Sequence, residues 1–360
     1  MICTSCGAKI ADDSRFCPVC GSTVAAGGFS RAGSLDLEAP VAPAPPAYTP
    51  PPVYTPPAYT PPPAPTAATS GPTRRIDSKR ELKLLLRQGW LVMLGEKRNL
   101  IISLLFPVIA AAIIVWIAGE NMFENYESTK SACFILVCAA IWCGLFNSIQ
   151  TIVKERENIK RDYVSGALRI GCYTASRAIL QCILCLVQSL VLCLAIPCVE
   201  LVYGNGLPSS GVLDGPVMLE YFISIFLVMY ASDAMGLMIS AFVKKDELAS
   251  KLAPYILIAQ LLFSGVLFVM EGGAQLLSGI MVSRWGMEAL GSVSDLNDLP
   301  LRIHEEAPMT VELVKHKAED AFAHDPEHLL LVWLVLLLFI AVPLLVCNIS
   351  LRNVKKDTRG

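Results

Sequence analysis

The chain has 360 residues, of which 54% are hydrophobic and only 17% are charged. Soluble domains usually carry about 25% charged residues, so this composition excludes an ordinary soluble enzyme and is typical of a membrane protein. The 29 Lys and Arg residues nearly balance the 31 Asp and Glu residues. This near-neutral charge gives no basic excess of the kind that nucleic-acid binding requires, so we expect no nucleic-acid partner.

Residues 1–24 contain two cysteine pairs with metal-ligand spacing. Cys3 and Cys6 form the first pair, Cys17 and Cys20 form the second, and each pair is followed directly by a glycine. Two Cys-x-x-Cys turns supply the four thiolates that tetrahedral zinc prefers, which leaves no open position for catalysis. The pattern resembles the short N-terminal zinc ribbons of many bacterial membrane proteins. We therefore expect structural zinc at a protein-contact module, with redox-active pairs as the alternative.

Residues 25–73 are expected to form a linker rather than a packed domain. The segment Tyr-Thr-Pro-Pro occurs three times, starting at Tyr48, Tyr54 and Tyr59. Proline fixes φ and removes backbone donors, which favours an extended tether. The alternative function of these repeats is to bind an aromatic-groove module of a protein partner. The nine remaining cysteines lie in or beside apolar runs, where cysteine serves as a small packing residue.

Residues 74–99 have the pattern of a basic amphipathic helix. Within residues 78–95, Leu82, Leu85, Leu86 and Trp90 recur at helical spacing, and lysines and arginines are interleaved with them. Such a helix lies along the membrane surface on its cytoplasmic side. A simple polar lead-in to the first span would not explain the apolar stripe.

Six apolar runs in residues 100–351 reach the length that a bilayer requires, about 20 residues. They are residues 100–118, 131–153, 178–199, 217–243, 252–270 and 329–348. Lys and Arg gather in alternate loops and in the tail at 352–360, and no signal peptide opens the chain, so the positive-inside rule predicts both termini in the cytoplasm of a multi-pass plasma-membrane protein. Residues 272–283 are too short to span and predict an outer re-entrant or interfacial helix. The expected fold is thus an all-α polytopic membrane protein with an N-terminal zinc ribbon.

Asp233 is the one unambiguous charge inside a predicted span. Carboxylates inside a membrane are costly, so each is a functional hypothesis by default. The neighbouring Tyr230 and Ser232 offer the alternative, a satisfied structural acid.

The loop after the second span carries interleaved charges from Lys154 to Gly166, continuing to Ser176. It resembles the first cytoplasmic loop of type-2 ABC exporter permeases of the G-subfamily kind, and residues 232–268 and 283–290 resemble further parts of that family. The resemblance implies a coupling helix that touches an ATPase. The residues carried over to that role are Glu155, Arg156, Arg161, Asp162, Gly166 and Arg169.

The resemblance also implies a dimer of two such membrane domains, whose second and fifth spans line a central pathway. By position, the pathway wall includes Cys143, Phe146, Asn147, Ile258 and Leu261, and an apolar valve includes Val266 and Leu267. No Gly-x-x-x-x-Gly-Lys-Ser/Thr loop occurs in these 360 residues, so we expect ATP to be bound by a partner chain and not by this one.

The expected function is therefore the non-enzymatic permease subunit of an ATP-driven exporter. Two alternatives remain open. One is a membrane anchor or sensor whose zinc ribbon recruits proteins without transport. The other is a proton-coupled carrier that uses Asp233.

Overall fold

The computed structural model describes residues 77–118, 121–204, 211–266, 268, 272–304, 311–315 and 319–353. The zinc ribbon with Cys3, Cys6, Cys17 and Cys20, the proline-rich linker and the last seven residues lie outside these described residues. The described residues are nearly all helical, with one short antiparallel hairpin. The predicted helical class is therefore confirmed for this part of the chain.

The helices follow one another along the chain with short connections. The first half contains α1 (Ser78–Gly95), α2 (Lys97–Ala118), α3 (Tyr126–Ser148), α4 (Thr151–Val164), α5 (Ile170–Cys193) and α6 (Ala195–Tyr203). The second half contains α7 (Val217–Phe242), α8 (Asp246–Leu262), α9 (Gly273–Gly279), α10 (Val282–Val293), the 3₁₀ turn η2 (Leu296–Asp298), β1 (Pro300–His304), β2 (Val311–Lys315), the 3₁₀ turn η3 (Asp320–Phe322) and α11 (Pro326–Arg352).

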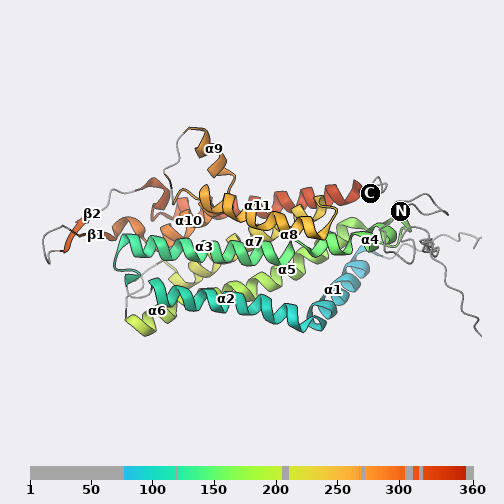
Figure 1. Cartoon of the computed structure of the whole chain (residues 1–360), viewed down its shortest axis with the longest axis horizontal. Coiled ribbons are helices and arrows are strands. Elements are labelled where there is room, and N and C mark those ends of the chain that lie inside the picture. The colour runs from blue at the N-terminus through green and yellow to red at the C-terminus, as the bar shows by residue number, and fades with distance from the viewer. Residues whose placement is uncertain are drawn as a thin grey trace, which may run out of the picture. The chain divides into compact units, whose positions relative to one another are not determined.

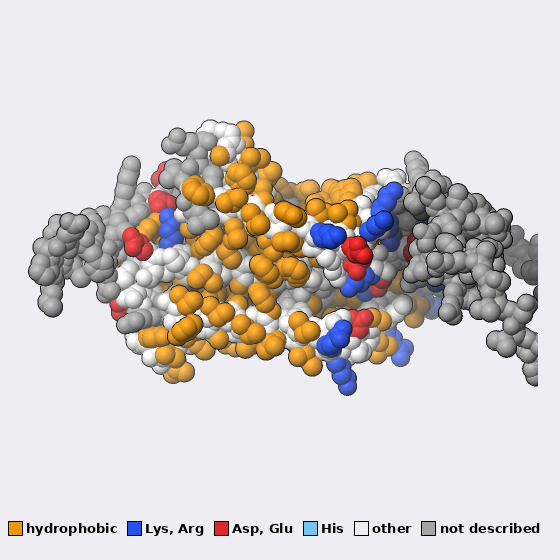
Figure 2. Space-filling view, viewed as in Figure 1, with side chains coloured by type: hydrophobic (Ala, Val, Ile, Leu, Met, Phe, Trp, Pro, Cys, Tyr) orange, Lys and Arg blue, Asp and Glu red, His pale blue; other side chains and the backbone are white. Residues whose placement is uncertain are grey.

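The long helices run side by side, with α1, α4 and the end of α11 at one end and α6, α10 and the hairpin at the other (Figure 1). Charged side chains gather toward these two ends, and the band between them is hydrophobic on the face shown in Figure 2. Many large apolar side chains are exposed in this band, such as Trp116 at 79% and Leu334 at 67%. Exposed apolar surface of this extent is expected where lipid is the solvent.

Five helical segments of the described residues are long and apolar enough to cross a membrane. They are Lys97–Ile117, Tyr126–Val164, Ile170–Tyr203, Val217–Phe242 and Pro326–Arg352. The sixth run that the sequence predicts, residues 252–270, corresponds to α8, which starts six residues earlier and has only 17 residues. The helix ends where Ser264 and Gly265 follow, and Gly265 takes a left-handed φ of +79° that favours glycine. The expectation of six spans thus remains a prediction.

The core is centred on α7, which packs against α3 over most of its length. Two glycines permit this close approach. A Cβ on Gly144 would lie 2.9 Å from the backbone nitrogen of Asp233 and would collide with the carbonyl of Met229, and a Cβ on Gly236 would lie 3.0 Å from the carbonyl oxygen of Leu145. Small residues at a helix crossing are the usual way to bring membrane helices together.

Candidate functional site

Helix α4 has one face directed into the bundle and one directed outward. Ile152 and Ile159 are buried against residues of α5, α7 and α11. Four polar residues at helical spacing are exposed on the other face, namely Lys154, Glu157, Asn158 and Arg161. We call these four residues the outer face of α4. The arrangement offers an exposed charged surface on a helix that is firmly packed.

Two of the predicted coupling residues point into the bundle instead. The Glu155 carboxylate accepts hydrogen bonds from Arg177 of α5, at 2.5 and 2.6 Å, and from the Tyr173 hydroxyl at 2.5 Å. Arg156 donates to the carbonyl of Ala241 at 2.8 Å, at the end of α7. These contacts fix α4 to α5 and α7.

The other predicted coupling residues lie at the C-terminal end of α4. Arg161 and Asp162 are paired with each other at 3.3 Å, and their side chains are 76% and 47% exposed. Gly166 has a left-handed φ of +77°, the usual conformation after a helix end. Arg169 is bound to α1, because its backbone N–H donates to Glu81 at 2.6 Å and its guanidinium contacts Glu81 and Ser78.

A groove of about 670 Å³ lies between α1, α2, α3 and α5. Three of the predicted pathway residues, Cys143, Phe146 and Asn147, line it. The remaining two, Ile258 and Leu261, lie on α8 outside the groove, and Ile258 is 51% exposed. One subunit therefore brings together the α3 part of the predicted pathway but not its α8 part.

The groove contains a network of polar side chains inside the apolar band. Asn147 accepts a hydrogen bond from Ser103 at 2.9 Å and donates to Gln188 at 2.5 Å, and Gln188 donates back to the Ser103 carbonyl at 2.8 Å. Gln181 donates to the Asn147 carbonyl at 2.9 Å. The sequence analysis did not single out Ser103, Gln181 or Gln188. The sequence could have indicated all three, because each is a polar residue within an otherwise apolar run.

A second cavity, of about 550 Å³, lies at the opposite end. Its wall includes Val266, one of the two predicted valve residues, whereas Leu267 lies outside the described residues. Two ion pairs also line it, Lys130 with Glu319 at 3.1 Å and Arg284 with Glu288 at 2.8 Å. We call this cavity the chamber; its wall combines ion pairs with apolar residues and includes the predicted valve residue Val266.

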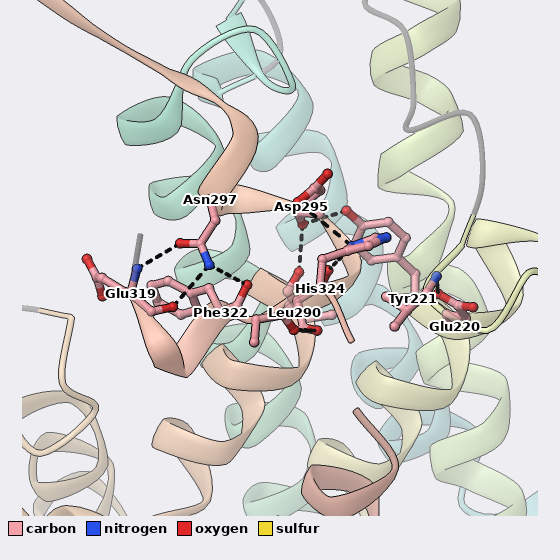
Figure 3. Close-up of polar contacts among 12 residues, drawn as sticks. Glu220, Tyr221, Leu290, Asp295, Asn297, Glu319, Phe322 and His324 are labelled. Atoms are coloured by element: carbon pink, nitrogen blue, oxygen red, sulfur yellow. Dashed lines mark hydrogen bonds and ion pairs between the residues drawn. The ribbon is translucent and has the colours of Figure 1, made fainter. Parts of the chain in front are cut away.

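Hydrogen bonds hold the segments around this chamber in place (Figure 3). The Asn297 side chain donates to the carbonyls of Glu319 and Phe322, at 3.0 and 2.9 Å, and accepts from the Glu319 N–H at 2.9 Å. The Tyr221 hydroxyl and the Ser294 hydroxyl are 2.6 Å apart, which ties α7 to the end of α10. Further along, Ser283 is joined to Gln260 of α8, with its N–H donating at 3.0 Å and its hydroxyl donating to the carbonyl at 2.5 Å.

Asp233 is fully buried on α7, and neither of its carboxylate oxygens has a hydrogen-bond partner within the described residues. The Ser148 hydroxyl donates at 2.6 Å to the backbone carbonyl of Asp233 and not to its side chain. Tyr230, which the sequence offered as a partner, donates to the Ala178 carbonyl, and Ser232 donates to the Val228 carbonyl. The structure therefore does not provide the satisfied environment that the structural interpretation of this acid requires.

Comparison with known families decides what the helical unit is. The ABC-2 type transporter family matches residues 80–294, which is more than half of the chain. The chain belongs to the ABC-2 type transporter family. The resemblance found in the sequence is thereby confirmed, and the helical unit is an ABC-type membrane subunit with several apolar helices, as a multi-pass membrane protein requires.

The chain is similar to the ABC transporter ATP-binding/permease protein Rv1747 of Mycobacterium tuberculosis. It is 26% identical to the ABC-2 chain over 228 residues, which are 60% of this chain and 26% of the relative. The chain therefore spans about a quarter of the length of that relative.

The zinc-ribbon domain family matches residues 2–24, which confirms the predicted kind of N-terminal domain. The ribbon's donor set of four cysteines suits structural zinc. Among the helices and loops that the structure describes, no group of three or more His, Cys, Asp or Glu side chains is arranged to hold a metal ion.

Proposed function

We propose that this ABC-2 chain is the membrane-spanning permease subunit of an ATP-driven exporter and that a separate ATPase chain powers it. The observation that carries the proposal is the outer face of α4, which presents charges on a helix that Glu155 and Arg156 fix to α5 and α7. Because α4 is fixed in this way, a movement of its outer face is transmitted to the membrane helices α5 and α7. The chain has no phosphate-binding loop of its own within its 360 residues, which supports an ATPase on another chain.

Within this proposal the predicted coupling residues divide into two roles. Arg161 and Asp162 contact the ATPase, since their side chains are the most exposed of the set. Glu155, Arg156, Gly166 and Arg169 give the coupling segment its shape and join it to α1, α5 and α7.

The organisation that we propose for the whole chain has five parts. Residues 1–24 form the zinc ribbon with Cys3, Cys6, Cys17 and Cys20 as ligands, 25–73 the linker, 74–99 a helix at the membrane surface, 100–351 the permease domain and 352–360 a cytoplasmic tail. Exposed Leu84, Leu91 and Leu94 support the membrane-surface position of α1. The basic loops support cytoplasmic termini.

We further propose that two permease subunits form the pathway. Phe146 of α3 is 45% exposed and Ile258 of α8 is 51% exposed, which leaves both available to a second subunit. In this arrangement α8 and the segment after it form the sixth crossing and its re-entrant turn, with Val266 and Leu267 as the valve beside the outer chamber.

Co-purification tests the proposal. The full chain, expressed with its candidate ATPase, should retain the ATPase and stimulate ATP hydrolysis, and Arg161→Ala should lose the stimulation. Deletion of residues 1–72 should leave transport intact, because the permease helices lie outside that segment. An intact membrane complex that holds no ATPase would contradict the proposal and favour the anchor or sensor function.

The orphaned carboxylate of Asp233 is the specific observation that favours the second candidate, a proton-coupled carrier. Such a carrier would transport without any ATPase and would stop when Asp233 is replaced by Asn. Transport assays with and without ATP separate the two candidates.

A further inference from the structure

We infer that the groove between α1, α2, α3 and α5 binds one anionic membrane lipid within a single subunit. The groove has a volume of about 670 Å³, which is within the range of small-molecule sites. It shares Cys143, Phe146 and Asn147 with the predicted pathway.

The chemistry of the groove changes in order along one stripe of α3 and α4. The lining residues recur at helical spacing, as Trp142, Cys143, Phe146, Asn147, Gln150, Thr151 and Lys154. They run from aromatic through amide to cationic side chains. Twelve residues separate Trp142 from Lys154, which corresponds to about 18 Å along a helix. A ligand that fits this order of side chains has an apolar tail and a charged head.

A free cation at the charged end favours an anionic head. The Lys154 side chain is exposed and makes no ion pair with the described residues. The Nε atom of Arg177 is buried and has no hydrogen-bond partner there. Glu155, in contrast, already accepts from Arg177 and Tyr173, so its charge is compensated. Within the described part of the chain, Lys154 is therefore an unpaired cation beside a compensated Glu155–Arg177 pair, and its ammonium group matches a phosphate group.

Three stacked rings provide the surface for the tail. Phe106 and Trp142 have ring centroids 6.1 Å apart, and Trp142 and Phe146 have centroids 5.3 Å apart. Trp142 and Phe146 remain 42% and 45% exposed. The neighbouring amides satisfy one another through Asn147 and Gln188, so an apolar chain can pass them without leaving a polar group unpaired.

The wall of the groove that α1 forms connects lipid binding to the loop after α4. Gly89, Val92 and Met93 of α1 line the groove, as does Glu96 directly after it, whose carboxylate accepts a hydrogen bond from Asn99 at 2.7 Å. Helix α1 is bound through Glu81 to Arg169 in the loop after α4. Occupancy of the groove is thus connected to the segment that we propose to contact the ATPase. This consequence rests on the proposed function, whereas the binding itself is measured without ATP or a partner.

The test is quenching of Trp142 fluorescence by lipids with brominated acyl chains in detergent micelles. The probes are brominated phosphatidylglycerol, which is anionic, and brominated phosphatidylcholine, which is zwitterionic. The Trp142 signal is the difference between the natural chain and Trp142→Phe, a variant that keeps an aromatic ring in the stack. We expect saturable quenching by phosphatidylglycerol at a concentration several-fold lower than for phosphatidylcholine.

Lys154→Ala should raise the half-quenching concentration of phosphatidylglycerol about tenfold, the effect of one charge-assisted hydrogen bond. The matched control is Lys251→Ala, which removes an exposed lysine of α8 that does not line the groove. Equal quenching by both lipids, or no effect of Lys154→Ala, would overturn the inference. So would the absence of quenching, which is the result if a second subunit covers Trp142. A failure here with an ATPase still coupled would leave the proposed function standing.

Discussion

Glu155 of α4 and Arg177 of α5 form a bidentate contact at the charged end of the molecule, with the guanidinium Nη2 2.5 and 2.6 Å from the two carboxylate oxygens. The side chains of Arg177 and Glu155 are 18% and 32% exposed, so the pair is largely shielded from water. This contact joins α4 to α5, so Glu155 is engaged within the bundle whereas Arg161 of the same helix is exposed.

Arg177→Ala should destabilise the helical unit, because it leaves the Glu155 carboxylate without its main donor. We expect a loss of about 1–3 kcal/mol, the cost of an unpaired and largely buried charged group. Thermal unfolding in detergent measures the loss. In a double-mutant cycle, Glu155→Gln should recover part of it, and strictly additive losses would contradict the contact.

Arg161→Ala is the variant to compare with Arg177→Ala, because it should affect function and not stability. This arginine is 76% exposed and, among the described residues, forms an ion pair only with its neighbour Asp162, so its removal should change stability by less than about 0.5 kcal/mol. Under the proposed function, ATPase stimulation in the co-purified complex should nevertheless fall, because we propose that this exposed charge contacts the ATPase. A variant that keeps full stimulation would assign the docking surface to other residues.

Gly144→Ala should separate α3 from α7. The new methyl group would collide with the carbonyl of Met229 and lie 2.9 Å from the Asp233 nitrogen, and these are backbone atoms that cannot turn away. We expect a loss of at least about 1–3 kcal/mol in thermal unfolding experiments, the usual cost of overpacking. Gly95→Ala at the end of α1 is the control, because nothing lies within 4 Å of its added methyl group.

Asp233→Asn tests whether the buried acid serves transport. The carboxylate oxygens have no described partner, so a neutral amide of the same shape should not lower stability. Under the ATP-driven proposal, ATP-dependent transport in proteoliposomes continues in this variant. Loss of transport in a stably folded variant would favour the proton-coupled carrier.

Substitution of a predicted zinc ligand tests whether the ribbon holds the metal. The natural chain should hold one zinc ion per molecule by elemental analysis, and Cys17→Ser should lower that content, because a ligand set of three thiolates binds more weakly. Cys198→Ser is the control, since Cys198 is a free and exposed cysteine outside the ribbon. An unchanged zinc content in Cys17→Ser would place the metal elsewhere.

Much of the helical framework follows from apolar patterns in the sequence. The segment 78–95 was predicted as one amphipathic helix, and α1 covers the same residues, because its leucines and basic residues alternate at helical spacing. The run 217–243 corresponds to α7, which ends one residue earlier. The run 252–270 differs from α8 for a local reason. Asp246 and Glu247 extend the helix at its start, where acids are favourable, and the left-handed Gly265 follows its end.

The candidate site was less predictable because composition does not reveal which way a side chain points. Glu155, Arg156 and Arg161 all belong to one charged loop in the sequence, yet only Arg161 is exposed. Helical spacing could have predicted the direction of Arg156, since it lies on the same helix face as the apolar Ile152 and Ile159. Arg177 could not be assigned to the groove from sequence alone, because its partner Glu155 lies on another helix.

Under the proposed function, the double contact between Gln260 and Ser283 has a consequence for how the end of the molecule that holds Val266 would open. Both residues are buried, at 2% and 0% exposure, and the two hydrogen bonds join the last turn of α8 directly to the first turn of α10. The chain between them, which includes Val266, therefore forms a closed loop with a fixed base. If this end opens during transport, we expect α8 and α10 to move together as a pair, and a cross-link between these two helices should leave transport unimpaired.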